Sequence, residues 1–259
     1  MKLGVCLEMV FENLRFADRI ARAADLGFAY GEMWHTDEAV KGGPEELAAL
    51  AEKHGVTITS AVAGAPGGTA ALTNPAVRKE WLQHVEKSLD YTKRAAIPNA
   101  IVCTGDTVEG MSEAETMQSV LDGLAEAVRL AETAGVTLLL EPLNTKVDHP
   151  GQWLDGSDKG ADICRKIGSP RLKLLYDCYH MQIMEGDLVG HLEANLDVIG
   201  HIHAAGHPGR HELWLGEINY PFLVKALEDM GYDGVFALEY APSMDDEESL
   251  RRTREHLGL

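Results

Sequence analysis

The sequence reads VTLLLEPLN over 136–144, LKLLYDCYH over 172–180, VIGHIHAAG over 198–206 and GVFALEY over 234–240. Each apolar segment has the composition of a buried strand and ends in a side chain that binds metal ions: Glu141, Asp177, His203 or Glu239. These residues are 36, 26 and 36 positions apart, about one strand–helix unit each time. A charged side chain in an apolar strand is costly unless it is paired or metal-bound. Four parallel strands would bring all four side chains to one rim, which predicts a metal site.

Apolar strand-like runs alternate with amphipathic helical stretches along all 259 residues. The expected strands lie near 3–9, 29–34, 57–64, 100–105, 136–144, 172–180, 198–206 and 234–241, and the expected helices near 11–26, 44–54, 75–95, 112–134, 157–168, 182–196, 220–231 and 246–257. Eight such units match the usual size of a (β/α)8 barrel, and continuously apolar strands fit a parallel sheet buried on both faces. A doubly wound open sheet is less favoured, because no GxGxxG follows the first strand. Since no linker or shift in composition interrupts the chain, we predict one α/β domain, a TIM barrel over residues 1–259.

Several helix boundaries are marked by capping residues. Asn74-Pro75 has the pattern of an N-cap followed by proline, and Ser112 with Glu115 forms a capping box. Helix ends are predicted at four glycines, Gly27, Gly55, Gly135 and Gly231.

The net charge of −18 argues against nucleic acid and anionic membrane surfaces as partners, because both attract a basic protein face. No apolar run is long enough to span a membrane, and the start MKLGVCLEMVFENLRF (1–16) lacks the pattern of a signal peptide. A cytoplasmic location is therefore expected. The four cysteines form no CxxC pair and are interpreted as reduced packing residues.

Glu141 and Glu239 end the fifth and eighth predicted strands, so they should face each other across the rim. A metal between them would place a substrate with one carboxylate on each side, as proton transfer between carbons requires. Asp177 and His203 complete a set of three oxygen ligands and one nitrogen ligand. Oxygen ligands favour Mg²⁺ or Mn²⁺, and the imidazole makes Co²⁺ or Zn²⁺ possible.

Other polar residues follow the same strand ends. His180 comes three residues after Asp177 and is a candidate donor to a substrate oxygen. Arg210 lies in the glycine-bearing loop HAAGHPGRHELWLGEINY (203–220), where a guanidinium could bind a carboxylate or hydroxyls. The loop VDHPGQWL (147–154) is a candidate lid carrying Trp153. Further candidates for substrate binding are Glu32, Trp34, His35, Asn144 and Lys146.

LLLEPLN (138–144), YDCYHMQIMEGD (176–187), HIH (201–203), PGRHE (208–212), GEINY (216–220) and LEY (238–240) together resemble the sugar isomerase/epimerase barrels related to xylose isomerase, and most of all hydroxypyruvate isomerases. The resemblance implies a TIM barrel with one divalent metal on Glu141, Asp177, His203 and Glu239. It also implies that the two glutamates transfer the proton and that His180 and Arg210 contact substrate oxygens. One position departs from the pattern: hydroxypyruvate isomerases tend to carry glutamine where this chain has His203, as ketose 3-epimerases do.

Two reactions therefore fit the sequence best. One is isomerisation of a small hydroxy-carbonyl compound of the hydroxypyruvate and tartronate semialdehyde type through an enediolate; the other is epimerisation of a ketose at carbon 3, of the D-tagatose or D-psicose type. A nuclease acting on abasic DNA would need a basic face, and a non-catalytic scaffold would not need an intact ligand set. A homodimer or homotetramer is expected.

Overall fold

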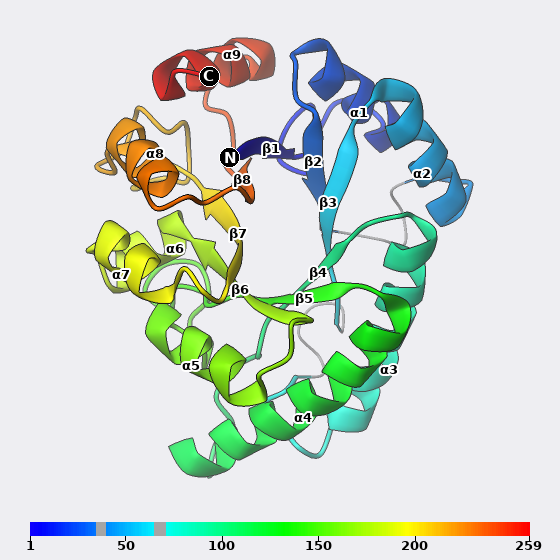
Figure 1. The fold of residues 1–259 in the computed structure, drawn as a ribbon, viewed down its shortest axis with the longest axis vertical. Helices are drawn as coiled ribbons and strands as arrows, with labels where there is room; N and C mark the ends of the chain where they lie inside the picture. The colour runs from blue at the N-terminus through cyan, green and yellow to red at the C-terminus, as the bar shows by residue number, and fades with distance from the viewer. Residues whose placement is uncertain (35–39, 65–70) are drawn as a thin grey trace.

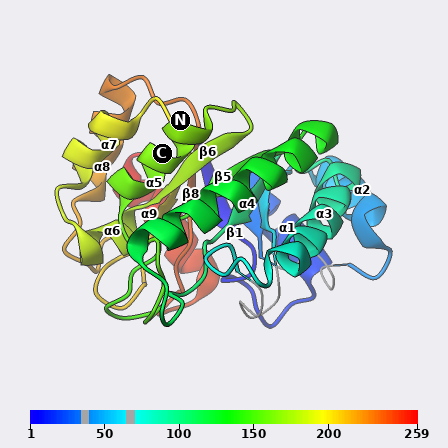
Figure 2. The same cartoon turned by 90° about the horizontal axis from the view of Figure 1, so that it is seen from below.

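The computed structural model describes residues 1–34, 40–64 and 71–259 of the chain. Its eight parallel strands pair in sequence order and close into a barrel, which confirms the predicted (β/α)8 fold. The strands are β1 (Lys2–Cys6), β2 (Tyr30–Met33), β3 (Thr57–Val62), β4 (Asn99–Val102), β5 (Thr137–Leu140), β6 (Leu172–Asp177), β7 (Ile199–Ala204) and β8 (Val235–Leu238). Helices surround them, and the two chain ends lie on the same side of the molecule (Figures 1 and 2).

The helices are α1 (Phe16–Asp25), α2 (Gly43–His54), α3 (Arg78–Arg94), α4 (Glu113–Ala134), α5 (Ser157–Ile167), α6 (Cys178–Met184), α7 (Leu188–Asn195), α8 (Tyr220–Asp229) and α9 (Asp246–Leu257). The capping box at Ser112 and Glu115 is present, and the left-handed Gly55 and Gly135 end α2 and α4 as predicted.

Three predicted helix boundaries are wrong. The helix expected from residue 11 begins only at Phe16, and Phe11 takes a positive φ angle of 54°. The stretch 182–196 is divided between α6 and α7, because Gly186 and Asp187 take positive φ angles of 71° and 41°. Asn74 does not cap α3: its Oδ1 accepts a hydrogen bond from the Ala76 backbone at 3.0 Å, which forms a turn before the helix begins at Arg78. An asparagine followed by proline favours either structure, and here the turn is the one that forms.

The inward side chains of the barrel lie in layers. Ile101, Leu139 and Leu175 form a small buried cluster that is separate from the main core. Because strand side chains alternate between faces, the residue two positions further on points to the same side. That next position is Glu141 after Leu139 and Asp177 after Leu175, so these ligand candidates are placed above the apolar cluster by the strand repeat itself.

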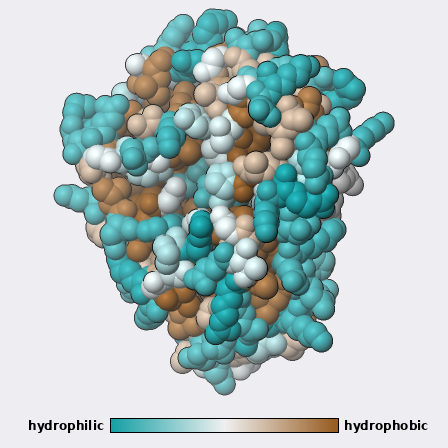
Figure 3. All heavy atoms as spheres, turned by 45° about the vertical axis from the view of Figure 1, so that its right-hand side comes forward, coloured by the Kyte–Doolittle hydropathy of each residue, from teal (hydrophilic) through white to brown (hydrophobic). Residues whose placement is uncertain are grey.

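The outer surface is mostly polar. Hydrophilic side chains cover much of the face in Figure 3, and hydrophobic side chains show between them in separate patches, in keeping with the net charge of −18. Within the described residues, none of the helices combines the length and the apolar character needed to cross a bilayer.

Candidate metal centre

The four predicted metal ligands converge at the C-terminal ends of β5 to β8. One ligand atom from each of Glu141, Asp177, His203 and Glu239 lies within 4.8 Å of the other three, and all four residues are buried. His203 Nδ1 is at the middle of the group, 3.5 Å from Glu141 Oε1, 4.0 Å from Asp177 Oδ2 and 3.2 Å from Glu239 Oε2.

Asp177 has two separate functions at this rim. Its Oδ1 accepts hydrogen bonds from the backbone N–H groups of Tyr179 and His180, at 2.7 and 3.1 Å, and so caps α6. Its Oδ2 is the oxygen that faces His203 Nδ1. The cap fixes the carboxylate on the rim, so Asp177 keeps its orientation without help from a ligand.

The charges of this cluster suit a cation. Three buried carboxylates surround His203 Nδ1, which has no hydrogen-bond partner in the described part of the chain. Burial and the charge of Glu239 raise the pKa of Asp177. Burial lowers the pKa of His203, but Glu32 and Glu239 outweigh that effect and raise it well above its usual value. The cluster therefore favours binding of a positive charge. A divalent ion coordinated by the three carboxylate oxygens and the imidazole nitrogen would supply that charge.

Glu239 is held by two donors in addition to its place among the ligands. Trp34 Nε1 donates to its Oε1 at 2.8 Å, and Arg210 Nη2 donates to its Oε2 at 2.6 Å. Burial raises the pKa of Glu239, but His203 and Arg210 outweigh it and bring the pKa below its usual range. Both predicted neighbours, Trp34 and Arg210, thus lie in the site and fix the carboxylate in its ionised form.

Arg210 is presented by an anchored loop. The Ala241 backbone donates to the Arg210 carbonyl at 2.9 Å, next to the end of β8. Glu212 Oε1 accepts from the Ser243 backbone at 2.9 Å and from Ser249 Oγ at 3.0 Å, and its Oε2 accepts from Ser243 Oγ at 2.8 Å. Glu212 is fully buried, so these bonds tie the loop to the start of α9 and hold the guanidinium near Glu239.

His180 lies beside the ligand group, with Nε2 at 3.5 Å from Asp177 Oδ2. Its Nδ1 is 2.6 Å from Asn144 Nδ2 and 3.3 Å from the Asn144 backbone nitrogen. Since both Asn144 groups are donors, Nδ1 accepts and the ring proton sits on Nε2. Burial lowers the pKa of His180 to about 4, so the ring is neutral at physiological pH. Asn144 orients His180 and is itself fully buried.

Other candidates lie elsewhere. Lys146 Nζ donates to the Ile183 carbonyl at 2.8 Å, at the end of α6, and bonds none of the four ligands. Glu32 is 1% exposed and lies behind His203, where its Oε2 is 3.1 Å from His203 Nε2. His35 lies outside the described residues. Trp153 is buried and donates to Glu113 Oε2 at 2.8 Å, which joins the 147–154 loop to the start of α4.

Three neighbours of the site were not predicted. His201 is buried next to Glu32, and its position two residues before His203 in the HIH segment was the available signal. Cys103 Sγ lies 4.0 Å from Glu141 Oε2, at the end of β4. The Tyr179 ring lies 5.3 Å from the guanidinium carbon of Arg210. Nothing in the local sequence distinguishes the last two from packing residues.

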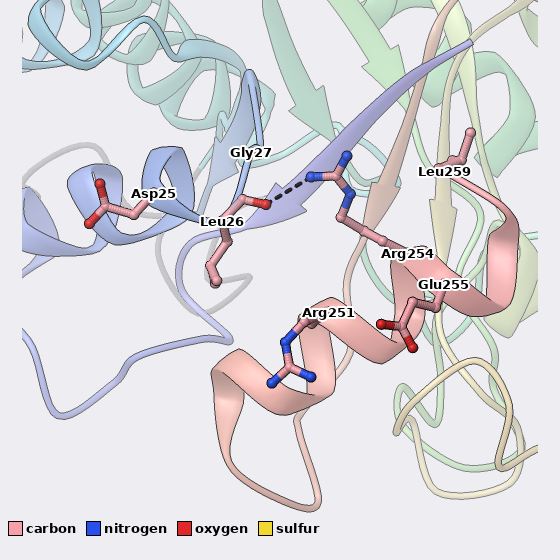
Figure 4. Close-up of a pocket in the computed structure, with 7 residues that line it drawn as sticks. All are labelled: Asp25, Leu26, Gly27, Arg251, Arg254, Glu255 and Leu259. Atoms are coloured by element: carbon pink, nitrogen blue, oxygen red, sulfur yellow. Dashed lines mark hydrogen bonds between the residues drawn. The ribbon is translucent and has the colours of Figure 1, made fainter.

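A recess at the opposite end of the barrel has no comparable chemistry. It lies between the α1–β2 connection and α9, where Arg254 Nη1 donates to the Leu26 carbonyl at 2.8 Å (Figure 4). A side chain at Gly27 would clash with that guanidinium. Arg254 therefore joins α9 to the connection between α1 and β2.

Comparisons with known proteins agree with the barrel fold. A family described as "Xylose isomerase-like TIM barrel" matches residues 20–258. The chain is 35% identical to the 2-oxo-tetronate isomerase of Cupriavidus necator, with 97% of each chain covered. It is 30% identical to the hydroxypyruvate isomerase of Escherichia coli K12, again with 97% of each covered. A crystal structure titled AP endonuclease, family 2, from Brucella melitensis superimposes with a TM-score of 0.88 at 26% identity and covers 98% of both chains. The chain belongs to the xylose isomerase-like TIM barrel family, and its similarity to curated isomerases extends over nearly its whole length.

Proposed function

We propose that this protein is a divalent-metal-dependent isomerase that moves a proton through an enediolate in a small hydroxy-carbonyl acid. The observation that carries the proposal is the convergence of Glu141, Asp177, His203 and Glu239 within 4.8 Å. The names of the relatives, 2-oxo-tetronate isomerase and hydroxypyruvate isomerase, support an acid of three or four carbons as the substrate.

The four ligands would hold one ion through three carboxylates and His203 Nδ1. When bound, such an ion polarises a substrate carbonyl and balances the negative charge of the enediolate. Mn²⁺ or Mg²⁺ suits the oxygen-rich set best, and the imidazole also allows Co²⁺ or Zn²⁺.

Glu141 and Glu239 act as the proton-transfer pair. They follow β5 and β8, which are not neighbours in the barrel, so a substrate between them has a carboxylate on either side. With hydroxypyruvate, the C3–H bond breaks, a carboxylate takes the proton, and C2 receives a proton in return. The hydroxyl proton on the C3 oxygen passes to the C2 oxygen, which leaves the carbonyl at C3 and gives tartronate semialdehyde.

Arg210 and His180 bind the substrate in this scheme. Arg210 Nη2 already reaches Glu239, and its Nε is buried without a hydrogen-bond partner among the described residues. A substrate carboxylate would accept hydrogen bonds from the Arg210 guanidinium. The neutral His180 ring carries its proton on Nε2 and can donate to a substrate oxygen.

Arg210→Lys should weaken the reaction through substrate binding. Lysine keeps the charge but loses the planar fork, and one lost bond to a charged group costs about 1.5–3 kcal/mol. We expect kcat/KM for hydroxypyruvate to fall by about 10–100-fold, mostly through KM. Steady-state kinetics measure this; an unchanged KM would show that Arg210 does not bind the substrate. Arg252→Lys, on the outer face of α9, is the matched control.

Epimerisation of a ketose at carbon 3 is the second candidate. The imidazole of His203 in the ligand set favours it, because the sequence pattern of ketose 3-epimerases has histidine at this position. The two reactions share the enediolate and differ in the carbon that receives the proton.

We further propose that the substrate is a small molecule and not a nucleic acid, although one similar structure is titled as an AP endonuclease. The net charge of −18 repels a phosphate backbone. Incubation with a duplex containing an abasic site should give no cleavage.

A substrate panel in D₂O tests the main proposal. Hydroxypyruvate, 2-oxo-tetronate and common ketoses are incubated with the Mn²⁺- or Mg²⁺-loaded protein and followed by NMR. We expect a shifted carbonyl with deuterium at the new C–H position of a 2-oxo acid. An inverted stereocentre with the carbonyl unmoved would favour the epimerase instead, and no exchange in any compound would contradict both.

A further inference from the structure

A fully buried carboxylate lies directly behind the metal-ligand histidine. Glu32 Oε2, on β2, is 3.1 Å from His203 Nε2 and 2.9 Å from Nε2 of a second histidine, His201. Ser60 Oγ donates to the same oxygen at 3.3 Å. None of these side chains is more than 2% exposed, so the group is closed to water.

These contacts determine which nitrogen of His203 carries the proton. An ionised carboxylate can only accept hydrogen bonds, so a contact with Glu32 requires a proton on Nε2. A neutral His203 then has its lone pair on Nδ1, the atom that faces Glu141, Asp177 and Glu239. The opposite tautomer would direct an N–H toward three carboxylates. For the neutral ring, Glu32 thus opposes the tautomer in which the proton takes the position of a metal ion.

The group is not arranged as a purely structural network. Among the described residues, Glu32 Oε1 and His201 Nδ1 are both buried without a hydrogen-bond partner. A buried polar group without a partner costs about 1–3 kcal/mol, which a network serving stability alone would avoid. All three close contacts instead fall on the one oxygen that touches His203.

We propose that Glu32, oriented by His201, is a positioning residue that fixes the tautomer of His203 and so determines how tightly the centre binds a divalent ion. This inference rests on the metal site of the proposed function. A carboxylate behind a ligating imidazole also makes that imidazole a stronger ligand, and removing such partners typically lowers metal affinity about 10–100-fold.

Mn²⁺ affinity of Glu32→Gln tests the proposal without an activity assay. The EPR signal of free Mn²⁺ during a titration gives the Kd, and circular dichroism checks the fold. We expect Kd to rise about 10–100-fold. Glu185→Gln is the matched control, because it changes another hydrogen-bonded glutamate, one that bonds Ser157 and does not contact the ligands or Arg210. The control should bind Mn²⁺ as the wild type does.

A double-mutant cycle separates positioning from general destabilisation. In a His203→Gln background no imidazole remains for Glu32 to orient, so adding Glu32→Gln should change the Mn²⁺ Kd by less than about twofold. An equal effect of Glu32→Gln in both backgrounds would overturn the proposal, and so would a wild-type Kd in the single variant.

The wild-type protein provides a second measurement if Glu32→Gln does not fold. In ¹⁵N-histidine NMR of the metal-free protein, at a pH where the ring is neutral, His203 should carry its proton on Nε2, with the signal assigned by its absence in His203→Gln. A proton on Nδ1 would overturn the proposal. Wild-type protein that binds no Mn²⁺ at all would instead contradict the metal site itself, which distinguishes the two failures.

Discussion

Glu239→Gln is expected to lower kcat by at least about 100-fold while the barrel remains folded. Glutamine has nearly the same shape, and its carbonyl oxygen can still accept the hydrogen bond from Trp34 Nε1, which is 2.8 Å from Glu239 Oε1 in the native site. It cannot accept a proton at neutral pH. The variant therefore removes the base and keeps the shape of the side chain, at the loss of the hydrogen bond that Arg210 donates to Oε2.

Two measurements check this result. Steady-state kinetics on the compound identified by the substrate panel give kcat, and loss of deuterium uptake from D₂O shows that the proton-transfer step itself has stopped. Glu185→Gln is the control, since this glutamate accepts hydrogen bonds from the Ser157 backbone and hydroxyl at 2.7 and 2.8 Å and should be needed only for stability. Near-normal turnover in Glu239→Gln would refute its role as a proton carrier.

Removal of divalent ions should have a similarly large effect. Exhaustive treatment with EDTA is expected to abolish turnover, and added Mn²⁺ should restore it, because the proposed mechanism needs the ion to polarise the substrate carbonyl. Full activity in chelated protein would exclude the proposed mechanism. Metal analysis before and after chelation shows whether the loss of activity follows the loss of the ion.

Thermal stability gives a readout that does not depend on turnover. An ion that binds only the folded state stabilises it by about 2.7 kcal/mol at a concentration 100 times its Kd. We expect Tm to rise with Mn²⁺ concentration in the wild type. The rise should be reduced in Asp177→Asn, which keeps the α6 cap through an amide oxygen but loses a charged ligand.

The sequence predicted the barrel and the convergence of the four candidate ligands at its rim for a physical reason. A buried parallel strand is apolar throughout, so a carboxylate or imidazole at its end is conspicuous, as at Glu141 and Asp177. The strand ends were still placed up to four residues too far along. β5 stops at Leu140, whereas its apolar pattern continues to Asn144, because residues in the following connection are buried as well.

The neighbours of the ligands were harder to assign, since their positions depend on contacts between distant segments. Lys146 follows Glu141 closely, yet its ammonium bonds the end of α6. Glu32 was expected to contact the substrate. In the structure its Oε2 lies 2.9 Å from Nε2 of His201, a residue 169 positions further along the chain. Strand periodicity gives the direction of a side chain, but not the partner it meets across a closed barrel.

The four candidate ligands lie at the ends of strands, whereas Arg210 lies in a loop, and this difference has an evolutionary consequence. Glu141, Asp177, His203 and Glu239 are set by the hydrogen-bonded backbone of the barrel, whereas Arg210 belongs to a connection fastened by Glu212. If the proposed function holds, insertions or replacements in that connection would change which compound is accepted and leave the proton-transfer pair in place. A directed search for new specificity would therefore randomise the 206–217 segment first and leave the strands untouched.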